Sequence, residues 1–142
     1  MIFPPGGEGT PTPLAAYLIN GDVPSVNRML TAAKNPRVRN SIKRNVEQSA
    51  AMQLLAQRAA PVECPVDVVF HWMIPNRRRD PDNIAGTGSK IYLDALQVAG
   101  VIPNDGWSEI ASITHTFQIK RDLKIDRCRI ELYPAGSRVG DD

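Results

Sequence analysis

The sequence predicts an α/β (α+β) fold, a single domain in which helices pack on one mixed β-sheet. The chain has 142 residues, of which 42% are hydrophobic, and this is enough for one hydrophobic core. Apolar residues recur at helical spacing in two stretches and at alternate positions in several others. These stretches follow one another in the order β-α-β-α-β-β, and we expect the last two strands to form a C-terminal antiparallel hairpin.

The first half of the chain supplies one predicted strand and the longest predicted helix. A short apolar run predicts a strand over residues 14–19, and the turn residues Asn20, Gly21 and Asp22 end it. Residues 24–35 are expected to form an irregular loop. Residues 37–59 are predicted to be a helix that Pro61 ends, because apolar side chains recur there every three or four positions.

The second half alternates strands with one shorter helix. Strict alternation over residues 66–74 predicts a strand with one buried face, which includes Trp72. A loop over residues 77–83 follows, and Ser89 is the expected N-cap of a helix over residues 90–99. Alternation then predicts strands over residues 111–119 and 128–132, joined by a tight connection at residues 121–124.

The two ends of the chain differ from this domain in composition. Residues 1–13 are rich in Gly and Pro and are expected to be a flexible extension, residues 14–134 the domain, and residues 135–142 a flexible tail. No segment resembles a signal peptide or a transmembrane helix. Cys64 and Cys128 match no metal motif, and no nucleotide-binding motif occurs. We therefore expect a cytoplasmic protein without a small-molecule cofactor.

Basic residues are concentrated in three stretches, although the net charge is only +2. They lie within residues 28–44, 77–79 and 120–129. Each stretch taken alone is ordinary for a solvated surface. Three of them around an acidic segment favour a DNA or RNA partner, since clustered Lys and Arg side chains bind phosphates.

The acidic segment begins directly after three arginines. Asp80 and Asp82 are two positions apart, so an extended chain would turn both carboxylates to one side. Mg²⁺ prefers such oxygen ligands, completed by water and substrate phosphate. Asp105 lies within reach of the chain beyond the predicted helix. The same residues also favour turns and the first turn of a helix. A purely structural role, without a metal, is therefore an open alternative.

Three submotifs in order resemble the RusA family of Holliday junction resolvases. They are residues 79–84 (Arg-Asp-Pro-Asp-Asn-Ile), residues 90–96 (Lys-Ile-Tyr-Leu-Asp-Ala-Leu) and residues 99–105 (Ala-Gly-Val-Ile-Pro-Asn-Asp). Residues 23–28 also resemble the Pro-Ser-x-Asn-Arg stretch that follows the family's first strand. Two departures are a longer connection before Lys90, which contains Gly86 and Gly88, and Asn104 where many relatives have an aspartate.

The resemblance implies a homodimeric endodeoxyribonuclease that cuts four-way DNA junctions by paired nicks, as found in bacteriophages. It implies Mg²⁺, or Mn²⁺ in its place, held by Asp80, Asp82 and Asp105, with Lys90 as the essential lysine. The residues expected to grip the DNA backbone are Arg77, Arg78, Arg79, Asn27 and Arg28. The secondary candidates for the site are Asn83, Asp94 and Asn104.

Two other functions fit the same residues. One is a non-catalytic accessory protein that binds branched DNA. The other is a metal nuclease that acts on flaps, forks or RNA. A pure DNA-binding protein gains nothing from carboxylates that face the phosphate backbone, so the nuclease is the preferred hypothesis.

Overall fold

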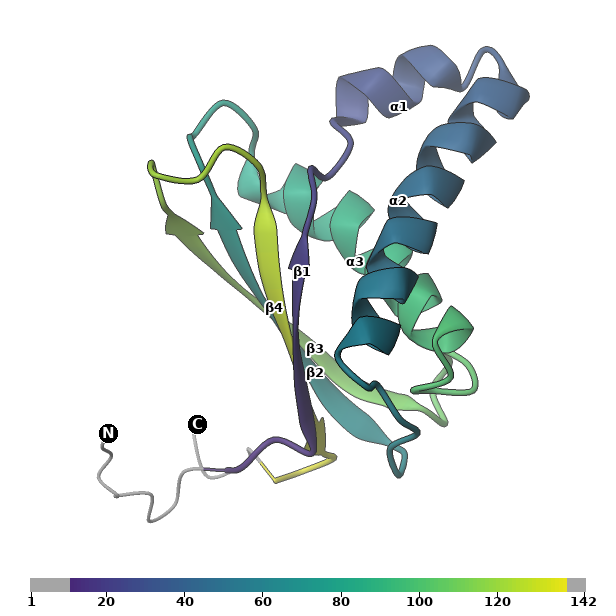
Figure 1. The fold of residues 1–142 in the computed structure, drawn as a ribbon, viewed down its shortest axis with the longest axis vertical. Helices are drawn as coiled ribbons and strands as arrows, with labels where there is room; N and C mark the ends of the chain where they lie inside the picture. The colour runs from purple at the N-terminus through teal and green to yellow at the C-terminus, as the bar shows by residue number, and fades with distance from the viewer. Residues whose placement is uncertain (1–10, 138–142) are drawn as a thin grey trace.

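One four-stranded sheet with helices against it makes up the described part of the chain, residues 11–137 of a computed structural model (Figure 1). The elements in order are β1 (Ala15–Asn20), α1 (Val26–Ala32), α2 (Pro36–Ala56), β2 (Val66–Ile74), α3 (Pro81–Val98), β3 (Ile110–Ile119) and β4 (Arg127–Pro134). The prediction of one domain with a mixed sheet is confirmed. The expected ends of the chain lie largely outside the described residues.

The sheet order is β1-β4-β2-β3, which corrects the expected C-terminal hairpin. β3 pairs with β2 in parallel, and β4 pairs antiparallel with both β2 and β1. β2 therefore lies between the two strands that were expected to be neighbours. Residues 120–126 can pass across the end of β2 from β3 to β4. Two strand spacings are only about 10 Å, and each extended residue spans about 3.3 Å.

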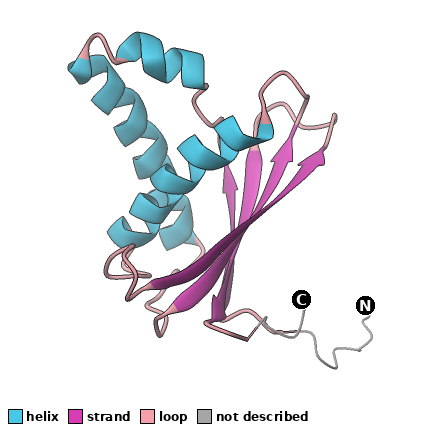
Figure 2. Ribbon diagram, turned by 180° about the vertical axis from the view of Figure 1, so that it is seen from behind, coloured by secondary structure: helices cyan, strands magenta, loops and turns pink. Residues whose placement is uncertain are grey.

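All the described helices lie on one face of the sheet, and the other face carries none (Figures 1 and 2). The strand residues that face the helices form the core, and Phe70, Trp72 and Ile130 are at most 1% exposed. Leu54 of α2 and Leu96 of α3 pack against them. The predicted burial of Trp72 is confirmed, and its ring stacks on that of Tyr92.

Residues 24–35 are not the irregular loop that the sequence suggested, since they contain α1. Ser25 caps this helix, with its Oγ accepting a hydrogen bond from the backbone N–H of Arg28 at 3.0 Å. The helical pattern is hard to read from the sequence because α1 has only seven residues and little apolar periodicity. The observed order therefore has two helices between β1 and β2.

α3 begins nine residues earlier than expected, at Pro81 instead of Lys90. Asp80 holds the N-cap position, Pro81 the first helical position, and Asp82 lies in the first turn. Pro and Asp both favour a helix start, which outweighs the two glycines that follow. Gly88 has a packing role, because a Cβ at this position would clash with the indole ring of Trp72.

The two glycines of α3 give a matched pair of stability predictions. Gly88→Ala should destabilise the fold by about 1–3 kcal/mol, because Trp72 is buried and cannot give way. Gly86→Ala should stabilise it by about 0.5–1 kcal/mol, since Gly86 is exposed on the helix and a Cβ there would meet no neighbouring side chain within 4 Å. Urea unfolding of both variants checks the signs, and equal effects would contradict this packing of α3.

Candidate active site

A buried ion pair fixes the loop before α3 against the loop before α1. The Arg79 guanidinium forms an ion pair with Asp126, which is 1% exposed, and one of its bonds, from Nη1, is 2.7 Å long. Nη1 also donates to the carbonyl oxygen of Val23 at 3.1 Å. The Asp126 carboxylate accepts from the N–H of Val23 at 2.8 Å. Arg79 and Asp126 therefore hold two segments together that are far apart in the sequence.

These segments line a pocket of about 230 Å³ beside the start of α3. Pro24 and Ser25 come from the loop before α1, and the rest of the lining comes from Arg78, Arg79, Asp80, Asn83 and Ile84. Both segments belong to motifs that resemble the RusA family, although Asn27 and Arg28, the residues of the first segment that were expected to grip DNA, are not part of this lining. The structure brings them together in one pocket.

Two carboxylates, those of Asp80 and Asp82, lie at the start of α3. The side chain of Asp80 makes no capping hydrogen bond, although the residue holds the N-cap position. Asp82 is exposed in the first turn. The two residues are not on one extended segment, because the chain becomes helical between them. Two carboxylates thus lie at the solvent-facing start of a helix whose dipole favours negative charge.

Lys90 and Asp105 form a second cluster further along α3. Lys90 Nζ lies 3.1 Å from Asp105 Oδ2 and 3.4 Å from Asp94 Oδ1. Lys43 of α2 adds an ion pair to Asp94 at 3.3 Å. The bond to Asp105 raises the pKa of Lys90 above its ordinary value, so this amine stays protonated. Lys90 is exposed, whereas its partners in the cluster are half-buried, and the cluster joins α2, α3 and the loop before β3.

The three predicted metal ligands do not meet within one copy of the chain. Lys90 comes ten residues after Asp80, which corresponds to about 15 Å along a helix. The carboxylate of Asp105 bonds to the Lys90 amine. No group of three or more His, Cys, Asp or Glu side chains in the described residues is placed to hold a metal ion. Asp80 and Asp82 are therefore separated from the third expected ligand.

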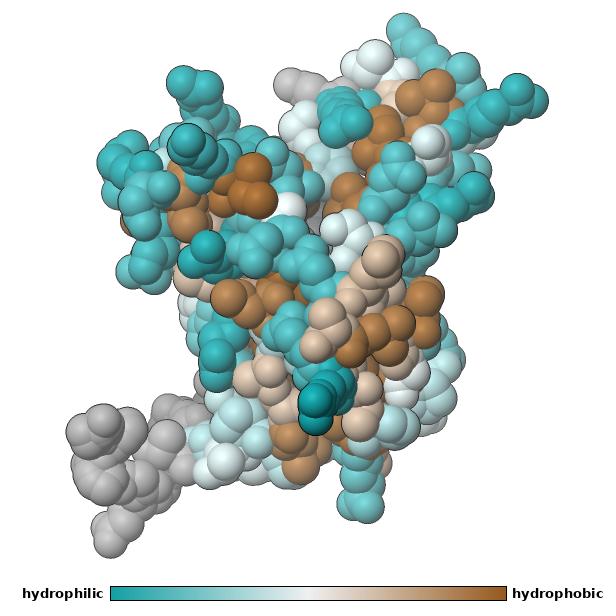
Figure 3. All heavy atoms as spheres, in the orientation of Figure 1, coloured by the Kyte–Doolittle hydropathy of each residue, from teal (hydrophilic) through white to brown (hydrophobic). Residues whose placement is uncertain are grey.

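Basic side chains gather at the same end of the sheet as the pocket. The parallel strands β2 and β3 end side by side, and the N–H of Lys120 donates to the carbonyl of Ile74 at 2.8 Å. The loops that follow them carry four exposed cations, namely Arg77, Arg78, Arg121 and Lys124. In Figure 3 hydrophilic side chains dominate the upper left, where Figure 1 shows these loops.

The remaining candidates have separate positions. Arg28 is exposed on α1, and the side chain of Asn27 lies outside the described part of the structure. Asn104 is exposed beside Asp105, and Trp107 in the same loop is 94% exposed. Asp126 was missed by sequence reasoning, because nothing in its local sequence distinguishes a buried partner of Arg79 from an ordinary loop aspartate.

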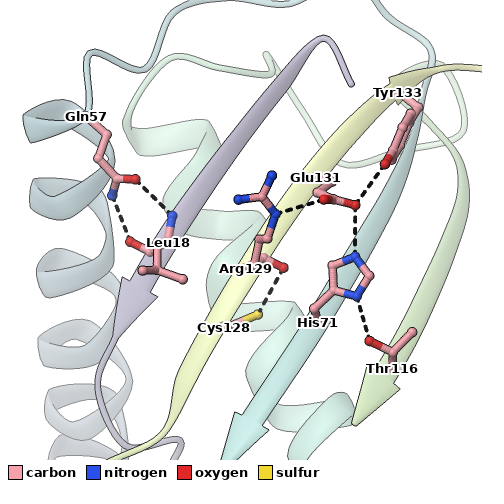
Figure 4. A network of polar contacts seen from close by, with 8 residues as sticks. All are labelled: Leu18, Gln57, His71, Thr116, Cys128, Arg129, Glu131 and Tyr133. Carbon is pink, nitrogen blue, oxygen red and sulfur yellow. Dashed lines mark hydrogen bonds and ion pairs between the residues drawn. The ribbon is translucent and has the colours of Figure 1, made fainter. Parts of the chain in front are cut away.

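A polar network on the helix-free face of the sheet was also missed (Figure 4). Glu131 on β4 accepts hydrogen bonds from the Tyr133 hydroxyl and Arg129 Nε, both at 2.8 Å. His71 Nε2 lies 2.8 Å from the same carboxylate, and its Nδ1 lies 2.6 Å from the Thr116 hydroxyl. Alternation of polar residues on β2 and β4 was the available signal, but the pairing of these strands was not predicted.

This network predicts an acid-sensitive contribution to stability. Burial raises the pKa of Glu131, but hydrogen bonds from Arg129, His71 and Tyr133 outweigh it, so the pKa lies below its ordinary value. The stabilisation is therefore present above the unfolded pKa of about 4.3 and is lost as pH falls through the folded pKa. Glu131→Gln should flatten the loss of stability between about pH 5 and pH 3, measured by urea unfolding. The exposed control Glu63→Gln should leave that slope unchanged.

Comparisons with known proteins assign no family to the chain, since neither a protein-family model nor a curated protein matches it. Within residues 11–137, no helix has the length and apolar character needed to cross a membrane. The resemblance to the RusA family stays a prediction from the three submotifs.

Proposed function

We propose that this chain is a Mg²⁺-dependent endodeoxyribonuclease that resolves four-way DNA junctions, with its active site at the start of α3. The observation that carries the proposal is the pocket that unites Pro24 and Ser25 with Arg78, Asp80 and Asn83. Both segments belong to submotifs that resemble the RusA family. Their convergence in one pocket, next to the Arg79–Asp126 pair, supports a shared site.

The donor set at the start of α3 fits a hard cation. Asp80 and Asp82 would hold Mg²⁺, with the side-chain amide of Asn83 close by, and all three offer the oxygen ligands that this ion prefers. When bound, the ion would activate water and stabilise charge on the scissile phosphate. Arg78 lines the same pocket and is exposed, so it can bind the phosphate next to the carboxylates.

The DNA backbone would follow the basic end of the sheet. The loops at this end supply four exposed cations, namely Arg77, Arg78, Arg121 and Lys124, of which Arg78 lines the pocket. Arg79 differs from the other two arginines of its run, because its guanidinium is engaged by Asp126 and Val23. We assign Arg79 a structural role in positioning the loop before α3. We assign Arg77 and Arg78 to binding the DNA phosphates.

The separation of Asp105 from Asp80 favours a homodimer in the proposed function. Paired nicks in a four-way junction require two sites related by the symmetry of the junction. A second copy would supply the second site. Its own Asp105 and Lys90 would also be able to approach the start of α3 in the first copy. Lys90 is protonated and exposed, so it can neutralise charge on a phosphate once there.

A substrate panel tests this proposal. The purified chain is incubated with a labelled four-way junction, fork, flap, duplex, single strand and RNA hairpin, each with Mg²⁺ and with EDTA. We expect Mg²⁺-dependent cleavage of the junction at least about tenfold faster than that of the duplex, a difference of about 1.4 kcal/mol in the barrier. Binding of the junction without cleavage would indicate the accessory protein. Faster cleavage of flaps, forks or RNA would indicate a different nuclease.

A further inference from the structure

The two edges of the sheet are treated differently by the fold, and β1 is the protected one. Gln57, the C-cap residue of α2, accepts from the N–H of Leu18 at 2.9 Å and donates to its carbonyl at 2.8 Å, as Figure 4 shows. One helical turn earlier, Gln53 makes the same two bonds with Asn20, both at 2.8 Å. Two glutamine side chains thus occupy the edge groups that another strand would use.

The opposite edge, β3, has no such protection. Among the described residues no strand pairs with its outer side. Its ten residues include no charged side chain, proline or glycine. Natural sheets usually block exposed edges with such residues, and a long uncharged edge strand is a template for pairing.

An apolar strip lies along β3 on the side of the sheet that the helices cover. Ile113 is 45% and Phe117 is 39% exposed, and half-buried His115 lies between them. The His115 ring stacks on Phe70 with 5.3 Å between centroids, and Trp72 Nε1 donates to its Nδ1 at 2.9 Å. The core therefore holds the His115 ring in place, while Ile113 and Phe117 on either side of it stay exposed.

We propose that β3 pairs antiparallel with β3 of a second copy, about a two-fold axis at His115. This inference rests on the homodimer of the proposed function and names its surface. A two-fold axis perpendicular to the sheet maps each face onto itself, so residues from the same face must be opposite one another. With the axis at His115, Ile113 of each copy lies opposite Phe117 of the partner subunit, so the pair forms twice.

This register matches the chemistry of both faces. On the helix side it joins the two apolar strips into one, with the paired Ile and Phe side chains covering each other. On the other side it places Thr114 opposite Thr116, a pairing of hydroxyl side chains that suits adjacent strands. The result is a continuous eight-stranded sheet with the helices of both copies on one face. An extended segment of an unrelated protein is the rival occupant of this edge.

Sedimentation velocity without DNA or metal tests the surface. The wild-type chain should sediment as a dimer at micromolar concentration, and Ile113→Lys and Phe117→Lys should shift it to monomer by at least about tenfold in the dissociation constant. Met52→Lys is the matched control, because Met52 is 70% exposed on α2 and should leave the dimer intact. A monomeric wild type would overturn the proposal. So would a dimer whose dissociation constant neither lysine substitution changes.

Cross-linking measures the register directly in a Cys64→Ser background, where the remaining Cys128 is buried. Co-expressed Thr114→Cys and Thr116→Cys chains should form a disulfide cross-link on mild oxidation, because directly opposite Cβ atoms lie about 4.5–5.5 Å apart. Neither variant alone should do so, because its two cysteines would be diagonal neighbours about 7–8 Å apart. Joining of the Thr114→Cys chain to itself would move the axis to Thr114 and overturn the register. Absence of any cross-link would overturn the edge pairing. A failed nuclease assay would leave both measurements unaffected.

Discussion

Asp82→Asn is expected to lower Mg²⁺-dependent junction cleavage by at least about 100-fold while junction binding stays equal or tightens. Asp82 is exposed in the first turn of α3, next to the pocket that Asp80 lines. Replacing its carboxylate with an amide removes a charged metal ligand, and it also removes negative charge that faces the DNA phosphates. Rate and affinity should therefore change in opposite directions.

The measurement is single-turnover cleavage beside a gel-shift titration of the same junction. Asp122→Asn is the matched control, because Asp122 is an exposed aspartate in the turn between β3 and β4. Loss of the Asp82 charge should cost the helix only about 0.3–1 kcal/mol, so the variant stays folded. Cleavage by Asp82→Asn at the wild-type rate would refute its role as a ligand.

The largest expected effect on stability is that of Asp126→Ala. Removing this carboxylate leaves the Arg79 guanidinium partly buried without its counter-ion, and it leaves the N–H of Val23 without an acceptor. Breaking a buried ion pair from one side costs about 3–5 kcal/mol. Because Arg79 also lines the pocket at the start of α3, cleavage should fall together with stability.

Urea unfolding and junction cleavage are measured on the same preparation of Asp126→Ala. Asp122→Ala, four residues earlier and exposed, should change stability by no more than about 0.5 kcal/mol. Where the alanine variant does not fold, Asp126→Asn keeps an acceptor for the N–H of Val23 and should lose less stability. An Asp126 variant as stable as wild type would show that the pair does not hold the two loops.

The elements that the sequence predicted well are those with a strong and long apolar pattern. β2 was predicted at its observed bounds, because five alternate residues from Val66 to Ile74 are apolar and buried. α2 was predicted to within a few residues for the same reason, since Ile42, Ala50 and Leu54 recur on one face. Such patterns follow from local chain geometry and need no knowledge of the partner element.

The elements that were missed depend on contacts between distant residues. Gly86 and Gly88 indicated a loop, whereas the helix continues through them because Gly88 allows Trp72 to lie against it. β3 and β4 looked like a hairpin, but β2 requires a partner on both sides and separates them. The Arg79–Asp126 pair spans 47 residues, so no local pattern could reveal it.

The candidate site was predicted in part for a similar reason. Four residues of one short run line one pocket, namely Arg78, Arg79, Asp80 and Asn83, whereas Asp82 of the same run lies outside that lining. Asp105 was expected beside them on the basis of chain reach alone, and the structure places it with Lys90 instead. Reach limits where a residue can go, but packing of the loop before β3 decides where it lies.

The most direct test of the central claim is nucleotide-resolution mapping of cuts in a four-way junction by the purified wild-type chain. With Mg²⁺ we expect paired nicks at symmetric positions in two opposing strands, and with EDTA no nicks. Absence of Mg²⁺-dependent nicks at saturating junction binding would contradict the assignment of the start of α3 as a nuclease site.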